Sequence, residues 1–355
     1  MLTMCSNVPT SRWKSGLFAL SFFLFLTAAR AASPVPSPTP VPHPTGRAIG
    51  IALEELEYPW PVHFLPLTLD GQDLRMAYMD VAPTGAANGR TVVLLHGKNF
   101  SGEYWESTAR FLAAAGFRVV VPDQIGFGKS SIAEIRYSFD RLAANTAKLL
   151  DSLQVQRVSL IGHSMGGMLA VRFVRNFPAR SEALVLANPI GLEDYRAKLP
   201  PVPLESVYAK ELANTDPEKI RAFYRRYFAE WKSDYERFPQ TRARIAGSGD
   251  FPRYATVSAL TYEMVYEQPV RHEFSLIRTP TLLVIGQADR TTIGRGLVPE
   301  EALQGLGNYP ALGKAAAADI SGSRLVELPN VGHLPQLEAP DRFRAAVLEF
   351  LGAPR

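Results

Sequence analysis

The segment Gly162-His163-Ser164-Met165-Gly166-Gly167 constrains the fold of this chain more than any other. The apolar run 157–161 before it predicts a buried strand, and residues 165–177 after it predict a helix. The chain must therefore turn from strand to helix at once, and the flanking glycines leave room for the backbone to close. Such a turn holds its central serine in a strained conformation and lifts the hydroxyl to the edge of a sheet. The helix N-terminus behind it favours developing negative charge.

Two downstream segments supply partners for Ser164. Residues 281–286 predict a strand that ends shortly before Asp289, and residues 324–328 predict another that ends before His333. The order serine, aspartate, histidine along the chain is that of one class of hydrolytic triad. His333 would take the proton of the serine hydroxyl, and Asp289 would orient the imidazole and stabilise its cation. Asp319 is nearer to His333 in sequence, but it does not directly follow a predicted strand.

A tetrahedral intermediate also needs backbone donors for its oxyanion. The predicted strand 91–95 runs into His96-Gly97-Lys98-Asn99. We predict that the N–H of Lys98, with that of Asn99 as the alternative, pairs with the N–H of Met165. Loss of one such donor typically costs about 3 kcal/mol of transition-state stabilisation. We interpret His96 and His163 as structural residues.

These motifs resemble the α/β-hydrolase superfamily, in the branch with a His-Gly turn after the third strand and a helical cap. The resemblance covers residues 57–351 and includes one further turn, after the fourth strand, of the form Asp-x-x-Gly-x-Gly-x-Ser: Asp123-Gln124-Ile125-Gly126-Phe127-Gly128-Lys129-Ser130. It implies an α/β fold with a mostly parallel eight-stranded sheet and helices on both faces. The serine at position 164 distinguishes the chain from the haloalkane dehalogenases and epoxide hydrolases, which resemble this branch but carry aspartate there.

Hydrophobic periodicity locates the remaining core elements. Strands are predicted near residues 62–69, 74–81, 91–95, 118–121, 157–161, 183–186, 281–285 and 324–328. Helices are predicted near residues 102–115, 139–153, 165–177 and 340–351. Alternation of strand and helix favours parallel βα units, with ligands bound beyond the carboxyl ends of the strands.

Two insertions interrupt this pattern. Residues 191–273 predict a helical cap in which aromatic residues recur at the spacing of one helix face: Tyr224, Tyr227, Phe228 and Trp231. We interpret most of this stripe as packing of the cap, with a subset that lines an apolar pocket over Ser164 and excludes water. The glycine-rich segment 292–323 predicts either a wall of the entrance or a surface excursion.

The N-terminus predicts export. Arg12 and Lys14 precede the apolar run 17–29, and Ala29-Arg30-Ala31 fits a cleavage signal, so residues 1–31 predict a signal peptide and a periplasmic or secreted enzyme. An uncleaved membrane anchor is the alternative. Residues 32–56 begin with a proline-rich stretch and predict a linker. The two core parts then span residues 57–190 and 274–352, on either side of the cap.

The sequence predicts a serine hydrolase that cleaves a carboxylic ester with a hydrophobic or aromatic moiety through an acyl-enzyme on Ser164. No cofactor or metal is expected, and a small molecule is the expected partner. A formal charge of +4 without a run of Lys and Arg does not indicate nucleic acid. Alternatives on the same triad are a C–C bond hydrolase of a dienoic diketone, an enol-lactonase and a proline-releasing aminopeptidase. The last would need acidic cap residues, for which these are available: Glu205, Glu211, Glu263 and Glu267. A non-catalytic binding protein is the alternative from another class.

Overall fold

The computed structural model describes residues 46–352. The predicted signal peptide and the predicted linker up to residue 45 lie outside this part. Within the described residues, no helix is both long enough and apolar enough to cross a membrane.

The centre of the fold is an eight-stranded sheet in the order β1-β2-β4-β3-β5-β6-β7-β8. Its strands are β1 (Val62–Leu69), β2 (Gln72–Val81), β3 (Thr91–Leu95), β4 (Arg118–Pro122), β5 (Val158–His163), β6 (Ser181–Ala187), β7 (Thr281–Gly286) and β8 (Arg324–Leu328). β2 pairs antiparallel with both of its neighbours, and all other pairs are parallel. Each strand overlaps a predicted one, so the predicted α/β fold with a mostly parallel sheet is confirmed.

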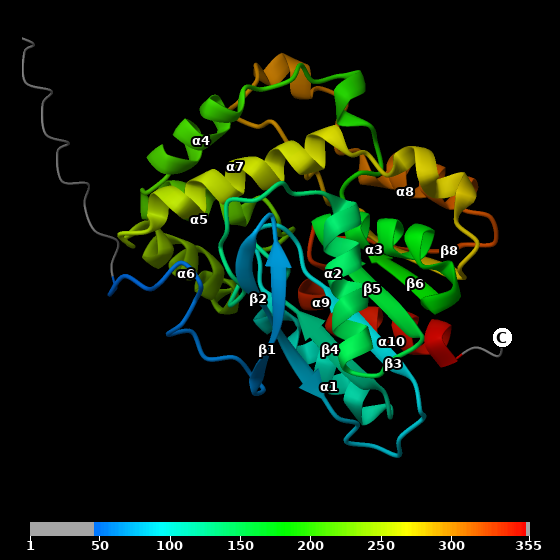
Figure 1. The fold of residues 1–355 in the computed structure, drawn as a ribbon. Helices are drawn as coiled ribbons and strands as arrows, with labels where there is room; N and C mark the ends of the chain where they lie inside the picture. Colours follow the sequence, from blue (N-terminus) through cyan, green and yellow to red (C-terminus); the bar gives the residue numbers. More distant parts are fainter. Residues whose placement is uncertain (1–45, 353–355) are drawn as a thin grey trace, which may run out of the picture. The chain divides into compact units, whose positions relative to one another are not determined.

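Helices cover both faces of the sheet (Figure 1). One face carries α2 (Phe139–Ser152), α3 (Met165–Asn176) and α8 (Tyr309–Asp319), and the other carries α1 (Glu106–Ala114), α9 (Pro335–Glu338) and α10 (Pro340–Gly352). Alternate residues of β3 point into the two hydrophobic cores: Val93 and Leu95 into the first, Val92 and Leu94 into the second. Because both faces are buried, this strand is apolar from Val92 to Leu95.

Four further helices lie between β6 and β7 and group together beyond one end of the sheet in Figure 1. They are α4 (Leu204–Ala213), α5 (Pro217–Arg225), α6 (Arg237–Ala246) and α7 (Phe251–Glu267). The start of α5 is set locally, because the Asp216 carboxylate accepts hydrogen bonds from the free N–H groups of the first turn. These helices fall within residues 191–273 and are called the cap below.

The predicted aromatic helix face in the cap is wrong. Helix α5 ends at Arg225, so Tyr227 and the aromatic residues after it do not continue the face of Tyr224. The carbonyl of Tyr227 instead accepts a hydrogen bond of 2.6 Å from the N–H of His333. This contact with a loop of the core competes with the next helical turn, a tertiary effect that periodicity does not contain.

Only the first half of the glycine-rich segment 292–323 is a loop, because its second half forms helix α8. This helix packs on β7 as an ordinary crossover between β7 and β8. Gly313 lies in its interior, where a Cβ atom would approach Ile285 to 3.0 Å. Close packing on the sheet therefore explains a glycine that intrinsic propensity would place outside a helix.

The described part of the predicted linker packs against the molecule. Ile49, Ile51 and Leu53 are buried, and the Arg244 guanidinium of α6 donates a 2.9 Å hydrogen bond to the Arg47 carbonyl. At the other end, the Lys129 ammonium of the core donates to the Leu53 carbonyl at 2.6 Å. We call residues 47–56 the N-terminal strap, since they connect the cap to the core.

Candidate active site

Ser164 occupies a sharp turn between β5 and α3, with φ 55° and ψ −122°. This is an unfavourable conformation for a residue with a side chain. A Cβ atom at Gly162 would lie 2.3 Å from the Gly166 carbonyl oxygen, and one at Gly166 would lie 2.1 Å from that of Leu95. Both positions therefore require glycine for the turn to close. The turn has the geometry of a nucleophile elbow.

Asp289 and His333 meet in a buried pair. The Asp289 carboxylate accepts a hydrogen bond from His333 Nδ1 at 2.7 Å, and two more, each 2.8 Å, from the Asn188 side-chain amide and the Thr291 N–H. Burial alone would raise the pKa of the Asp289 carboxyl, but His333 and the hydrogen bonds outweigh it and lower that pKa. The carboxylate thus stays ionised and fixes the orientation of the imidazole.

The hydroxyl of Ser164 forms no hydrogen bond with another described residue. His163, which precedes Ser164 in the chain, is hydrogen-bonded to the main chain of His333. His163 Nε2–H donates to the His333 carbonyl at 2.8 Å, and its Nδ1 accepts from the Tyr104 hydroxyl at 2.9 Å. Tyr104 in turn accepts from the N–H of Gly97 at 3.2 Å. Burial and the neighbouring His333 hold the pKa of His163 well below its usual value. A neutral histidine therefore connects the oxyanion turn with the main chain of His333.

His96 also binds main chain rather than facing a cavity. Its Nε2 accepts a 3.0 Å hydrogen bond from the N–H of Gln124, and its Nδ1 lies 2.9 Å from the Gly97 carbonyl. Because the Nε2 accepts, the proton is on Nδ1 and donates to that carbonyl. His96 thus ties the His-Gly turn to the turn after β4.

Of the two predicted oxyanion donors, Met165 directly follows Ser164 in the chain, and Lys98 follows a turn that lies close to Ser164 in space. Met165 is the first residue of α3, where N–H groups have no partner within the helix. The His-Gly turn approaches so closely that a Cβ atom at Gly97 would lie 3.1 Å from that of Ser164. Lys98 follows this turn and lines the same cavity as Ser164. The choice between Lys98 and Asn99 as the second donor stays a prediction.

Ser164 opens into a cavity of about 150 Å³ under the cap, called the nucleophile cavity below. Its apolar and aromatic walls come from the core and from the cap: Ile190, Val207, Phe223, Tyr227, Tyr262, Ile293 and Leu297. Charged residues also line it: Lys98, Lys210, Glu211 and Arg295. The first half of the 292–323 segment thus contributes a wall, as one of the two predicted alternatives had it.

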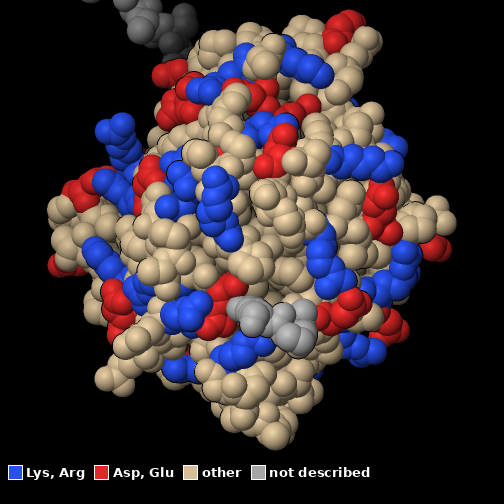
Figure 2. Space-filling view, turned by 90° about the vertical axis from the view of Figure 1, so that its right-hand side faces the viewer, with Lys and Arg blue, Asp and Glu red and all other residues tan. Residues whose placement is uncertain are grey.

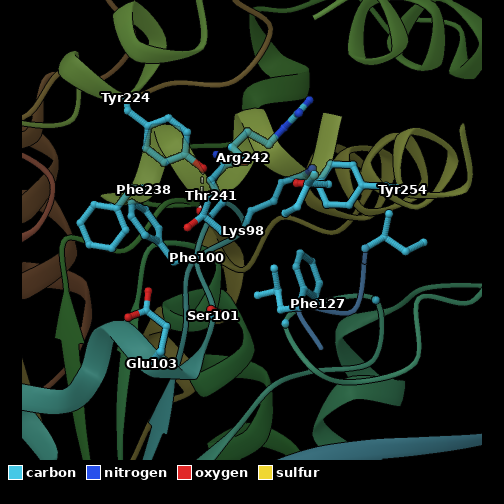
Figure 3. A pocket seen from close by; sticks show the side chains of 16 residues that line it. Lys98, Phe100, Ser101, Glu103, Phe127, Tyr224, Phe238, Thr241, Arg242 and Tyr254 are labelled. Carbon is cyan, nitrogen blue, oxygen red and sulfur yellow. Dashed lines mark hydrogen bonds between the residues drawn. The ribbon is translucent and has the colours of Figure 1, made fainter. Parts of the chain in front are cut away.

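Lys98 and Asn99 also line a second cavity of about 60 Å³, which we call the back chamber. Figure 3 shows Lys98 there with Arg242 and Tyr254. The strap residues Ile51 and Leu53 also line the chamber. Burial lowers the pKa of Lys98 to about 8, with Glu211 opposing and Arg242 adding to this effect.

The family model described as the alpha/beta hydrolase fold matches residues 90–340. The chain belongs to the α/β-hydrolase family. It is 30% identical over 289 residues to a 2-hydroxy-6-oxononadienedioate/2-hydroxy-6-oxononatrienedioate hydrolase of Burkholderia vietnamiensis, covering 79% of this chain and 92% of that protein. It is 26% identical over 276 residues to a 2-hydroxy-6-oxo-6-phenylhexa-2,4-dienoate hydrolase of Burkholderia cepacia, covering 75% of this chain and 89% of that protein.

Among solved structures, this α/β-hydrolase is similar to a "probable hydrolytic enzyme" of Pseudomonas aeruginosa PAO1. The two share 48% identity with a TM-score of 0.83, over 86% of this chain and 98% of that one. The enol-lactonase of Burkholderia xenovorans LB400 shares the fold at 23% identity and a TM-score of 0.61, over 81% of this chain and all of that one.

The protein is accordingly an enzyme, a hydrolase of a family that acts on small molecules. The alternative of a non-catalytic binding protein is not supported. On the face shown in Figure 2, basic and acidic side chains are interspersed, without a large area of one sign. Within residues 46–352, no group of three or more His, Cys, Asp and Glu is arranged to hold a metal ion.

Sequence reasoning missed the charged lining of the nucleophile cavity. The sequence predicts a role only for the backbone N–H of Lys98, yet Lys98 lines the cavity and its ammonium binds Ser258, another residue of the lining. Of the acidic residues that an aminopeptidase would need, Glu211 lines the cavity, but it forms an ion pair with Arg242. A lysine directly after the His-Gly turn was the available signal, because that turn is adjacent to the nucleophile.

Proposed function

We propose that this α/β-hydrolase cleaves a carbon–carbon bond beside a ketone in a hydroxy-oxo-dienoate, through an acyl-enzyme on Ser164. The observation that carries the proposal is the buried Asp289–His333 hydrogen bond together with a strained Ser164 that opens into a capped cavity. The class of substrate is taken from the names of the two Burkholderia relatives.

In this proposal, Ser164 attacks the ketone carbon while His333 Nε2 accepts the hydroxyl proton. The N–H groups of Met165 and Lys98 stabilise the oxyanion. The bond to the neighbouring carbon then breaks, its electron pair leaves with the dienol fragment, and that carbon takes up a proton. Water, activated by His333, cleaves the acyl-enzyme to the free acid. One water is consumed, its hydroxyl ending on the acid and its hydrogen on the leaving carbon.

Hydrolysis of a carboxylic ester is the second candidate and uses the same residues. The observation that favours it is the apolar part of the cavity wall, formed by Val207, Phe223 and Leu297 among others. An ester oxygen is a better leaving group than carbon, so this reaction needs no separate proton donor for a leaving carbon.

A direct test compares the two reactions with the same protein. Wild-type enzyme and Ser164→Ala are given 2-hydroxy-6-oxononadienedioate, with loss of the conjugated chromophore as readout, and 4-nitrophenyl esters of graded chain length. The proposal expects turnover of the dienedioate with kcat/KM well above that of any ester, and its disappearance in Ser164→Ala. Fast ester hydrolysis with an inert dienedioate would replace it by the second candidate. Turnover that survives in Ser164→Ala would reject both.

A further inference from the structure

The side chain of Lys98 reaches from the oxyanion turn to the cap. Its ammonium donates a 2.9 Å hydrogen bond to the hydroxyl of Ser258 on α7. Lys98, Ser258 and Ser164 all line the nucleophile cavity. A positive charge is therefore held within reach of a molecule that occupies this cavity.

This charge makes no direct ion pair among the described residues, although the nearby Glu211 carboxylate stabilises it electrostatically and binds the same Ser258 hydroxyl. Glu211, an acidic residue that also lines the nucleophile cavity, is engaged by the Arg242 guanidinium. Lys98 is partly buried, and cations withdrawn from water are normally paired, because desolvation of an isolated charge is costly. With a pKa of about 8, Lys98 nevertheless remains mostly protonated at neutral pH. An unpaired ammonium in a substrate cavity is suited to receive an anionic group.

Two hydroxyl groups of the same cavity are also available. Tyr262 follows Ser258 by one turn on the same face of α7, and its hydroxyl is buried without a hydrogen-bond partner among the described residues. The Thr291 hydroxyl is in the same situation. Buried hydroxyls usually have partners. Burial raises the pKa of Tyr262 to about 12, so this phenol stays a donor.

The other cations of the cavity are already engaged. The Lys210 ammonium donates to the carbonyl oxygen of Arg295, and the Arg295 guanidinium pairs with Glu300 at 3.1 Å. Lys98 is thus the cation of this cavity with neither a carbonyl nor a carboxylate partner among the residues described.

We infer that Lys98 and Tyr262 form a carboxylate-binding subsite, so that the substrate acylating Ser164 carries a carboxylate group. The inference rests on the proposed function only in taking Ser164 as the nucleophile, and it holds for either bond type. The carboxylate oxygens would accept charge-assisted hydrogen bonds from the ammonium and from the phenol. Lys98 is then a specificity-determining residue through its side chain.

The test uses two esters with the same leaving group and chain length: the mono-4-nitrophenyl ester of glutaric acid, which keeps a free carboxylate, and 4-nitrophenyl pentanoate. We expect wild-type enzyme to prefer the glutarate ester in kcat/KM. Lys98→Met should lower the ratio of the two kcat/KM values about tenfold or more, mainly through KM of the anionic ester. Tyr262→Phe should lower it less, and Lys98→Arg should restore part of the preference over Lys98→Met.

A ratio unchanged in folded Lys98→Met protein would overturn the inference. Lys210→Met is the matched control, because it removes a cation from the same cavity and should leave the ratio within about threefold. If wild-type enzyme hydrolyses neither ester, the calorimetric affinity for glutarate is compared between wild type and Lys98→Met. Weaker binding by the variant then supports the subsite while ester hydrolysis fails, and equal or absent binding overturns it. Turnover lost in Ser164→Ala with glutarate binding retained separates the two proposals.

Discussion

The Asp289 carboxylate accepts hydrogen bonds from three groups: the His333 imidazole, the Asn188 side chain and the main chain of Thr291. We expect Asp289→Asn to reduce kcat about 10⁴-fold, because an amide at this position favours the wrong imidazole tautomer. The volume hardly changes, but the amide NH2 would face at least one donor that the carboxylate now binds, so a loss of about 1–3 kcal/mol in stability is also expected. Steady-state kinetics on any accepted substrate tests this. A loss of less than about tenfold would show that another group orients His333.

The pH dependence of KM for an anionic substrate should reflect the titration of the Lys98 ammonium. Its charge is present below a pKa of about 8 and is lost as the pH rises through that value. KM for an anionic substrate is therefore expected to rise above about pH 8, while KM for a neutral ester is not. Other titratable groups line the two chambers beside it: Glu103, Lys210, Glu211, Tyr224, Tyr227, Arg242, Tyr254, Tyr262 and Arg295.

A KM profile from pH 6 to 9.5, measured for wild type and for Lys98→Met, shows whether Lys98 or another of these groups titrates. The variant should show the same weak KM across the range if Lys98 is the titrating group. A rise near pH 8 that persists in Lys98→Met would show that another of these groups, and not Lys98, titrates.

At the scale of elements, the passage from β5 to α3 depends on close contact with β3. In Gly166→Ala, the added methyl group would collide with the Leu95 carbonyl oxygen. We expect a loss of about 3 kcal/mol in the free energy of unfolding. Gly249→Ala is the control, because no atom lies within 4 Å of the Cβ it would add. Urea unfolding of both variants would contradict the expectation if their midpoints were equal.

Elements whose pattern is local were predictable, and those set by distant contacts were not. The strands have apolar runs because both faces of the sheet are buried, and the elbow has glycines because its own backbone demands them. The end of α5 depends instead on a hydrogen bond between Tyr227 and His333, and helix α8 accepts Gly313 because Ile285 is close. Chain order was enough to predict the Asp289–His333 pair, which the structure brings within hydrogen-bond distance. The Lys98 side chain was missed because its partner Ser258 is on the cap.

At the scale of the whole molecule, the N-terminal strap belongs to the folded unit. Leu53 is 5% exposed and packs in the core cluster that includes α2 and α3. Leu53→Ala should cost about 2–3 kcal/mol of folding free energy through lost burial and the cavity left behind. The same substitution at Leu212, which is 36% exposed on α4, should cost less than about 1 kcal/mol. Equal losses would mean that the strap is not integral to the fold.

The strap also affects how molecules reach Ser164. It fixes α6 through Arg47 and the core turn through Lys129, so the cap is held at a third place besides its two connections to β6 and β7. A cap attached in this way is hindered from rotating as a rigid body about its two connections to the core. We therefore expect substrate and product to pass the loop 291–297, which lines the nucleophile cavity, whereas no strap residue does. Hydrogen exchange of backbone amides should accordingly be faster in that loop than in α6.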